Sequence, residues 1–116
     1  MTKIVTNRPA FQGDVMLIRI AALPAGLVPV AAENGRLIVT HSETGHHHVI
    51  EARPTVTMYR LPEEIYEAFI VVDGEPATLE HLRPHDTHEA LSLTPGIYQV
   101  RRQREYVSEG FRRAAD

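Results

Sequence analysis

Histidine is the residue type whose number and spacing in this chain point most directly to chemistry. Three of the seven histidines are consecutive, at His46, His47 and His48, and a second group follows at His81, His85 and His88. Neutral imidazole nitrogen binds zinc, iron, nickel and other divalent ions, with bonds to zinc of about 2.0–2.1 Å. The sequence therefore predicts a divalent-metal site (Zn, Fe, Ni or Mn) if the fold brings the two groups together.

The strand expected at residues 46–52 decides which of these side chains can act together. Because side chains alternate between the two faces of a strand, His46 and His48 share one face and His47 lies on the other. The alpha carbons of His46 and His48 are then about 6.6 Å apart, which allows both rings to reach one ion. A third ligand must come from the second group. The candidate metal ligands are His46, His48, His81 and His88, with His41 and His85 as further candidates.

Two other interpretations of the histidines are open at this point. Each one can be a solvated or hydrogen-bonded residue without a functional role. Closely spaced imidazoles also titrate as a coupled set near their ordinary pKa of about 6.5, which makes a surface responsive to pH. The chain contains no Gly-x-Ser-x-Gly motif, phosphate-binding glycine loop or His-Glu-x-x-His motif, so no catalytic residue is identified and enzyme activity stays open.

Size and composition narrow the class of protein. The 116-residue chain is 43% hydrophobic and 23% charged, which is typical of one globular domain. Its formal net charge of −3 argues against nucleic acid and anionic membranes as partners, since phosphate binding needs clustered Lys and Arg. The absence of cysteine excludes disulfides and thiolate zinc sites. No segment has the pattern of a signal peptide or a membrane span, so we expect a cytoplasmic protein.

Short apolar or alternating runs bounded by turn residues dominate the sequence, and no long segment has helical periodicity. The pattern predicts about seven short strands, most clearly at 15–20, 36–40, 55–61 and 68–72. Such a pattern is typical of an all-β fold, a small barrel or sandwich. We expect a single domain over residues 1–116, with an N-terminal arm at 1–12 and a C-terminal tail at 107–116.

Two turn signals predict how strands connect. Asn34-Gly35 is a strong signal for a two-residue hairpin turn before the strand at 36–40. Thr94-Pro95-Gly96 predicts a hairpin between strands at 89–93 and 97–106.

The last strand combines an apolar half with a charged half. Tyr98, Val100 and Arg102 share one face of it, and arginines are frequent beyond Val100. Charged side chains of this kind discourage further strand pairing, so this half is expected at the edge of a sheet. Because small β-domains often cover an edge by pairing with another copy, we expect a homo-oligomer.

Several motifs resemble those of a family of small uncharacterised bacterial proteins. The resemblance depends on Thr44-Gly45-His46-x-His48, Pro95-Gly96-x-Tyr98-x-Val100 and Arg102-Gln103-Arg104-Glu105-Tyr106. It implies a bacterial single-domain protein and no established activity. His46-x-His48 followed by Glu51 and a later Pro-Gly is also weakly similar to cupins, jelly-roll barrels that hold a metal on inward-facing strands. A cupin has its acid further along and a histidine shortly after the Pro-Gly, and this chain departs at both places.

Two hypotheses for the function follow. The first is a small soluble protein with a histidine-lined, metal-binding site built from His46 and His48 plus His81 or His88. The second is a non-enzymatic interaction or self-association module, in which the histidine loops and the arginine-rich last strand form the surface. Converged histidines that face one another favour the first hypothesis, and splayed, exposed histidines favour the second.

Overall fold

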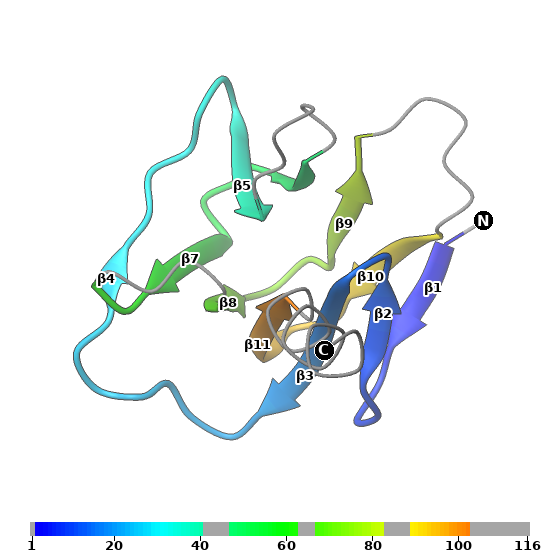
Figure 1. Ribbon diagram of the computed structural model, residues 1–116, viewed down its shortest axis with the longest axis horizontal. Helices are drawn as coiled ribbons and strands as arrows, with labels where there is room; N and C mark the ends of the chain where they lie inside the picture. Colours follow the sequence, from blue (N-terminus) through cyan, green and yellow to red (C-terminus); the bar gives the residue numbers. More distant parts are fainter. Residues whose placement is uncertain (1, 41–46, 63–66, 83–88, 103–116) are drawn as a thin grey trace, which may run out of the picture.

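The computed structural model describes residues 2–40, 47–62, 67–82 and 89–102, which form eleven strands in two sheets (Figure 1). Apolar side chains alternate along the strands, so that one face of each sheet fills the core and the other faces outward. The structure confirms the predicted all-β class and shows a sandwich of two sheets, not a closed barrel. Short strands of two to four residues raise the number above the predicted seven.

Sheet A contains five strands in the order β1-β10-β9-β6-β5. β1 pairs with β10 in parallel, and the other neighbours are antiparallel. The strands of sheet A are β1 (Thr2–Val5), β10 (Ala90–Leu93), β9 (Ala77–His81), β6 (His48–Glu51) and β5 (Arg36–Thr40).

Sheet B contains six antiparallel strands in the order β2-β3-β11-β8-β7-β4. In Figure 1 it extends from β4 on the left to β2, whereas sheet A extends from β5 at the top to β1 on the right. The strands of sheet B are β2 (Ala10–Gln12), β3 (Val15–Ile20), β11 (Gly96–Arg102), β8 (Glu67–Val72), β7 (Val56–Arg60) and β4 (Val28–Pro29).

The segment expected as an N-terminal arm contributes a strand to each sheet. β1 ends the order of sheet A and β2 ends the order of sheet B, so residues 2–12 pass from one sheet to the other. Val5, Ala10 and Gln12 are buried and fix this segment against the core. The expected tail at 107–116 lies outside the described residues.

The hairpin predicted at Thr94-Pro95-Gly96 is wrong. The strand before this turn, β10, belongs to sheet A, and the strand after it, β11, belongs to sheet B. The turn therefore carries the chain across the sandwich. At Asn34-Gly35 the tight turn is confirmed by positive φ angles of 52° and 77°, but only the single bridge between Glu33 and Arg36 precedes β5.

The edge position predicted for the charged half of the last strand is also wrong for its described part. β11 pairs with β3 on one side and with β8 on the other, up to Arg101 and Arg102. The predicted shared face is correct, since Tyr98 and Val100 are buried and Arg102 is half-buried beside Asp14. A central strand tolerates this inward arginine because a carboxylate from a neighbouring turn pairs with it.

One end of the sandwich is closed by an arginine from β3. Arg19 donates hydrogen bonds to the Pro95 carbonyl at 3.0 Å, to the Thr94 hydroxyl and to the Tyr98 hydroxyl at 2.8 Å. Its guanidinium also lies 5.1 Å from the centre of the Tyr98 ring, within cation–π range. The polar residues with potential for chemistry lie at the opposite end, where β6 begins and β9 and β11 end.

Candidate histidine site

Five polar side chains from both sheets meet at that opposite end, and we call them the His48 cluster. Its members are Gln12 at the end of β2, Asp14 in the turn before β3, His48 at the start of β6, His81 at the end of β9 and Arg102 at the end of β11. Gly13, with a φ of 59°, makes the tight turn between Gln12 and Asp14, a conformation that glycine adopts without strain. This turn directs two neighbouring polar residues into the same site.

His48 and His81 are brought together by strand pairing. They are opposite each other in the antiparallel register of β6 and β9, and their rings stack at 4.0 Å between centroids with an interplanar angle of 8°. His48 is only 3% exposed and His81 is half-buried. The expectation that the two histidine groups converge is therefore met by one member of each, and the two rings face each other.

Gln12 fixes the protonation pattern of the His48 ring. Its side-chain Nε2 donates to the backbone carbonyls of Leu79 and Glu89, both at 2.9 Å, so its Oε1 must face His48 Nδ1, 2.8 Å away. A carbonyl oxygen only accepts, and Nδ1 therefore carries a proton and donates it. In the neutral ring the lone pair is then on Nε2.

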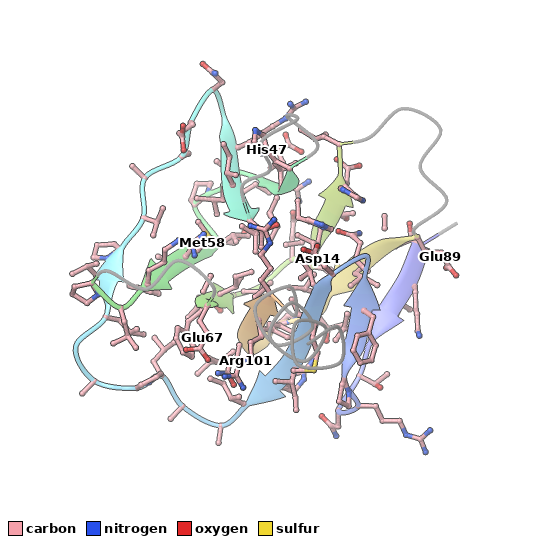
Figure 2. The ribbon with its side chains drawn as sticks, in the orientation of Figure 1. Asp14, His47, Met58, Glu67, Glu89 and Arg101 are labelled. Carbon is pink, nitrogen blue, oxygen red and sulfur yellow. The ribbon has the colours of Figure 1, made fainter. Side chains whose placement is uncertain are left out.

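Asp14 lies on the Nε2 side of the ring. Its Oδ1 is 3.5 Å from His48 Nε2, and its Oδ2 accepts a hydrogen bond from Arg102 Nε at 3.0 Å. A hydrogen bond from His48 when its Nε2 carries a proton, and then the hydrogen bond and charge of the Arg102 guanidinium, hold the pKa of the Asp14 carboxyl well below its usual range, although partial burial opposes this. Asp14 is therefore ionised at neutral pH, and Figure 2 shows it in the middle of the molecule.

The position of Asp14 Oδ1 beside His48 Nε2 requires a positive charge between the two atoms when Nε2 carries its lone pair. A neutral imidazole lone pair and a carboxylate at 3.5 Å repel each other unless a positive charge lies between them. That charge can be a proton on Nε2 or a metal ion bound to both atoms. The contact is longer than a charge-assisted N–H···O bond of about 2.7–2.9 Å. It is close to the separation of about 3.4 Å between two ligand atoms on a tetrahedral ion with bonds of about 2.1 Å.

The other predicted ligands belong to parts of the chain that the structure does not describe. His46 and His88, and the further candidates His41 and His85, lie outside the described residues. Among the residues that the structure describes, no group of three or more His, Cys, Asp or Glu side chains is arranged to hold a metal ion. His48 and His81 are the two candidates that the fold places together.

Sequence reasoning missed Gln12, Asp14 and Arg102. Gln12 is 36 positions from its partner His48, and Asp14 is 88 positions from Arg102, so no local motif connects them. One signal is present in the sequence: Gly13-Asp14 directly precedes the strand predicted at 15–20, and an acid after a glycine turn is well placed to enter a site.

A separate hollow lies on the outer face of sheet A. It has a volume of about 150 Å³ and is lined by Glu51, Arg53, Ala77, Thr78 and Glu80. Arg53 pairs with Glu51 at 3.4 Å and with Glu75 at 3.7 Å, so its charge is already balanced. These exposed ion pairs are typical of a solvated surface.

Comparisons with known proteins place the chain in a family. No helix in the described ranges has the length and apolar character needed to cross a membrane. Neither the comparison with curated proteins nor that with solved structures found a match. A family model does match residues 11–103, which include all five residues of the His48 cluster. The chain thus belongs to the family described as a domain of unknown function, DUF8820.

Proposed function

We propose that this protein is a divalent-metal-binding domain whose ion is held by His48 Nε2 and Asp14 Oδ1, between the two sheets. The observation that carries the proposal is the 3.5 Å separation of these two atoms, combined with the proton that Gln12 fixes on Nδ1. A metal-bound histidine typically donates its other ring N–H to a protein acceptor, as His48 does to Gln12.

Two further residues complete the proposed site. Arg102 orients the carboxylate through Oδ2 and leaves Oδ1 for the ion, as hydrogen-bonded partners of ligating carboxylates do. His81, whose ring stacks on that of His48, is proposed as the third ligand. Because the stacked rings lie in nearly parallel planes, His81 must turn about its side-chain torsions to direct a nitrogen to the same ion. His46 and His88 remain predicted ligands from the sequence alone.

The ligand chemistry supports a particular class of ion. Two imidazoles and one carboxylate suit zinc, iron, nickel or manganese better than calcium or magnesium, which prefer oxygen ligands. Three protein ligands would leave coordination positions for water or a substrate, where such an ion acts as a Lewis acid or activates water. Asp14, with 39% of its side chain exposed, gives this site access to solvent.

The test is metal uptake by untagged protein, measured by elemental mass spectrometry after zinc loading and desalting. We expect near-stoichiometric metal in the wild type and a clear loss in Asp14→Asn, which keeps the side-chain shape at a partly exposed position. His48→Gln should lose metal too. His47→Ala is the matched control, because alternation places this adjacent histidine on the opposite face.

Two results would contradict the proposal. Wild-type protein that takes up no zinc, nickel, iron or manganese would leave a proton as the cation between His48 and Asp14. Equal uptake by the wild type, Asp14→Asn and His48→Gln would place the ion elsewhere in the histidine-rich chain. Circular dichroism of each variant separates loss of metal from loss of fold.

A further inference from the structure

Arg102 uses only part of its hydrogen-bonding capacity within the His48 cluster. It lies at the end of β11, on the inner face that also carries Tyr98 and Val100, and 18% of its side chain is exposed. Its Nε donates to Asp14 Oδ2 at 3.0 Å, and in the described part of the chain this is the only hydrogen bond that it donates. A guanidinium has five N–H donors, so those on Nη1 and Nη2 are available to a ligand.

The position of the Asp14 carboxylate explains why these donors are left over. An arginine and a carboxylate often form two parallel N–H···O bonds, which would occupy both oxygens of Asp14. Here Oδ1 instead faces His48 Nε2 at 3.5 Å, and only Oδ2 accepts a hydrogen bond from Arg102. Arg102 is therefore anchored through Nε alone, and its two Nη groups stay unbound at the same end of the sandwich.

The charges of the proposed metal site are not balanced by the residues of the cluster. A divalent ion and the Arg102 guanidinium together bring three positive charges, and histidines that bind an ion through a lone pair are neutral. Asp14 is the only acid among the five residues of the His48 cluster, and it brings one negative charge. Because the local dielectric constant of a partly buried site is lower than that of water, the excess positive charge attracts an anion strongly.

We propose that this site binds a small oxyanion, a carboxylate or phosphate group, between an open coordination position of the ion and the Nη groups of Arg102. The inference rests on the proposed function, since it assigns a class of ligand to the same metal site. The planar fork of arginine matches two oxygens of such a group, and the ion binds a further oxygen. The anion enters from the side of Asp14, whose side chain is 39% exposed, because His48 is 3% exposed.

The test follows the visible absorption of protein loaded with Co²⁺, which replaces zinc and whose absorption depends on its ligands. Acetate and inorganic phosphate are the two anionic probes, added in a buffer without chloride. Acetamide is the neutral probe, with nearly the same shape as acetate. We expect a saturable spectral change with at least one of the anions and none with acetamide, and the tighter-binding anion identifies the preferred group.

Arg102→Gln tests the role of the arginine. Glutamine carries its Nε2 at the same distance along the side chain as arginine Nε, so it can still donate to Asp14 Oδ2, but it lacks the charge and the fork. At saturating Co²⁺ this variant should bind the preferred anion about tenfold more weakly than the wild type, since a charged donor is lost. Arg101→Gln is the matched control and should leave anion affinity unchanged, because Arg101 is 61% exposed and lies on the opposite face of β11.

The cobalt content of each sample, measured by elemental mass spectrometry, separates failure of this inference from failure of the proposed function. Wild-type protein that takes up no cobalt contradicts both. Wild-type protein that takes up cobalt but responds to neither anion up to about 50 mM overturns this inference alone. An equal response to acetamide and acetate, or equal anion affinity in Arg102→Gln and the wild type, also overturns it. Circular dichroism establishes that both variants are folded.

Discussion

The Gln12 side chain holds the His48 ring from across the sandwich, with 2.8 Å between Oε1 and Nδ1. Gln12 belongs to sheet B and His48 to sheet A, and both are almost completely buried. The same amide donates to the carbonyl of Leu79 in sheet A and to that of Glu89, directly before β10. This one side chain therefore connects the sheets through three hydrogen bonds and determines which nitrogen of His48 faces Asp14.

Replacing Gln12 with Ala should lower the free energy of unfolding by about 2–4 kcal/mol, because two buried hydrogen-bonding groups and one partly buried carbonyl lose their partner. Urea denaturation with a chelator present measures the change without any contribution from metal. Phe11→Ala, at the exposed neighbouring position, is the control and should cost well under half as much. A Gln12→Ala effect no larger than that of the control would show that the network contributes little to stability.

The depressed pKa of Asp14 predicts an acid-dependent loss of stability. A carboxyl whose pKa is lower in the folded than in the unfolded state stabilises the protein above its unfolded pKa, near the ordinary 3.8. This contribution disappears as the pH falls below that value toward the folded pKa. As the pH is lowered from about 5 to 3, the urea concentration at the midpoint of unfolding should therefore fall more steeply for the metal-free wild type than for metal-free Asp14→Asn. Parallel pH profiles would contradict the proposed pairing of Asp14.

Replacing His81 with Phe separates stacking from metal ligation. Phenylalanine keeps an aromatic ring beside His48 but removes both nitrogens, so stability should change by no more than about 1 kcal/mol. If His81 is the third ligand, zinc affinity should fall by about tenfold or more, as titration calorimetry would measure. Unchanged affinity in His81→Phe would assign the third position to another ligand, whereas a large loss of stability would indicate a different structural role for the imidazole.

Gly96→Ala should destabilise the end of the sandwich opposite the His48 cluster. The added Cβ would lie 2.5 Å from Arg19 Nη1, at a φ of +156°, so Arg19 must leave its contacts with Pro95, Thr94 and Tyr98. We expect a loss of about 1–3 kcal/mol. Gly74→Ala, where the nearest atom would be 3.8 Å away, is the comparison and should lose only the conformational cost of about 1 kcal/mol. Equal losses at both positions would show that Arg19 adapts easily.

The strands themselves were predictable from sequence, since 15–20, 36–40 and 68–72 owe their structure to local alternation and β-branched residues. Which strands pair with each other was not predictable from the sequence. Thr94-Pro95-Gly96 signals a turn but contains no information on whether β11 returns to the sheet of β10 or crosses to the other. The charge on Arg102 suggested an edge because its partner Asp14 is distant in sequence and becomes adjacent only in the fold.

The candidate site, like the fold, was only partly predictable from the sequence. Histidine spacing indicated that His46 and His48 share one face of a strand and that the two groups could meet, and the register of His48 with His81 provides that meeting. Gln12, which fixes the proton on His48 Nδ1, and Asp14, which lies beside Nε2, are contributed by the end of β2 and the turn that follows it. Neither hydrophobic periodicity nor a local motif in a single sequence reveals such contacts between sheets.

The pairing of β1 with β10, and of β3 with β11, has a consequence for how quickly the protein reaches its native state. Thr2 is opposite Ala90 and Val15 is opposite Arg102, so long loops must close before these ladders gain any hydrogen bonds. Domains dominated by such non-local pairings fold in about milliseconds to seconds, slower than helical proteins of equal size. The His48 cluster, which joins residues from both sheets, is therefore expected to assemble late, and an ion bound there would act on the folded molecule rather than guide the chain toward it.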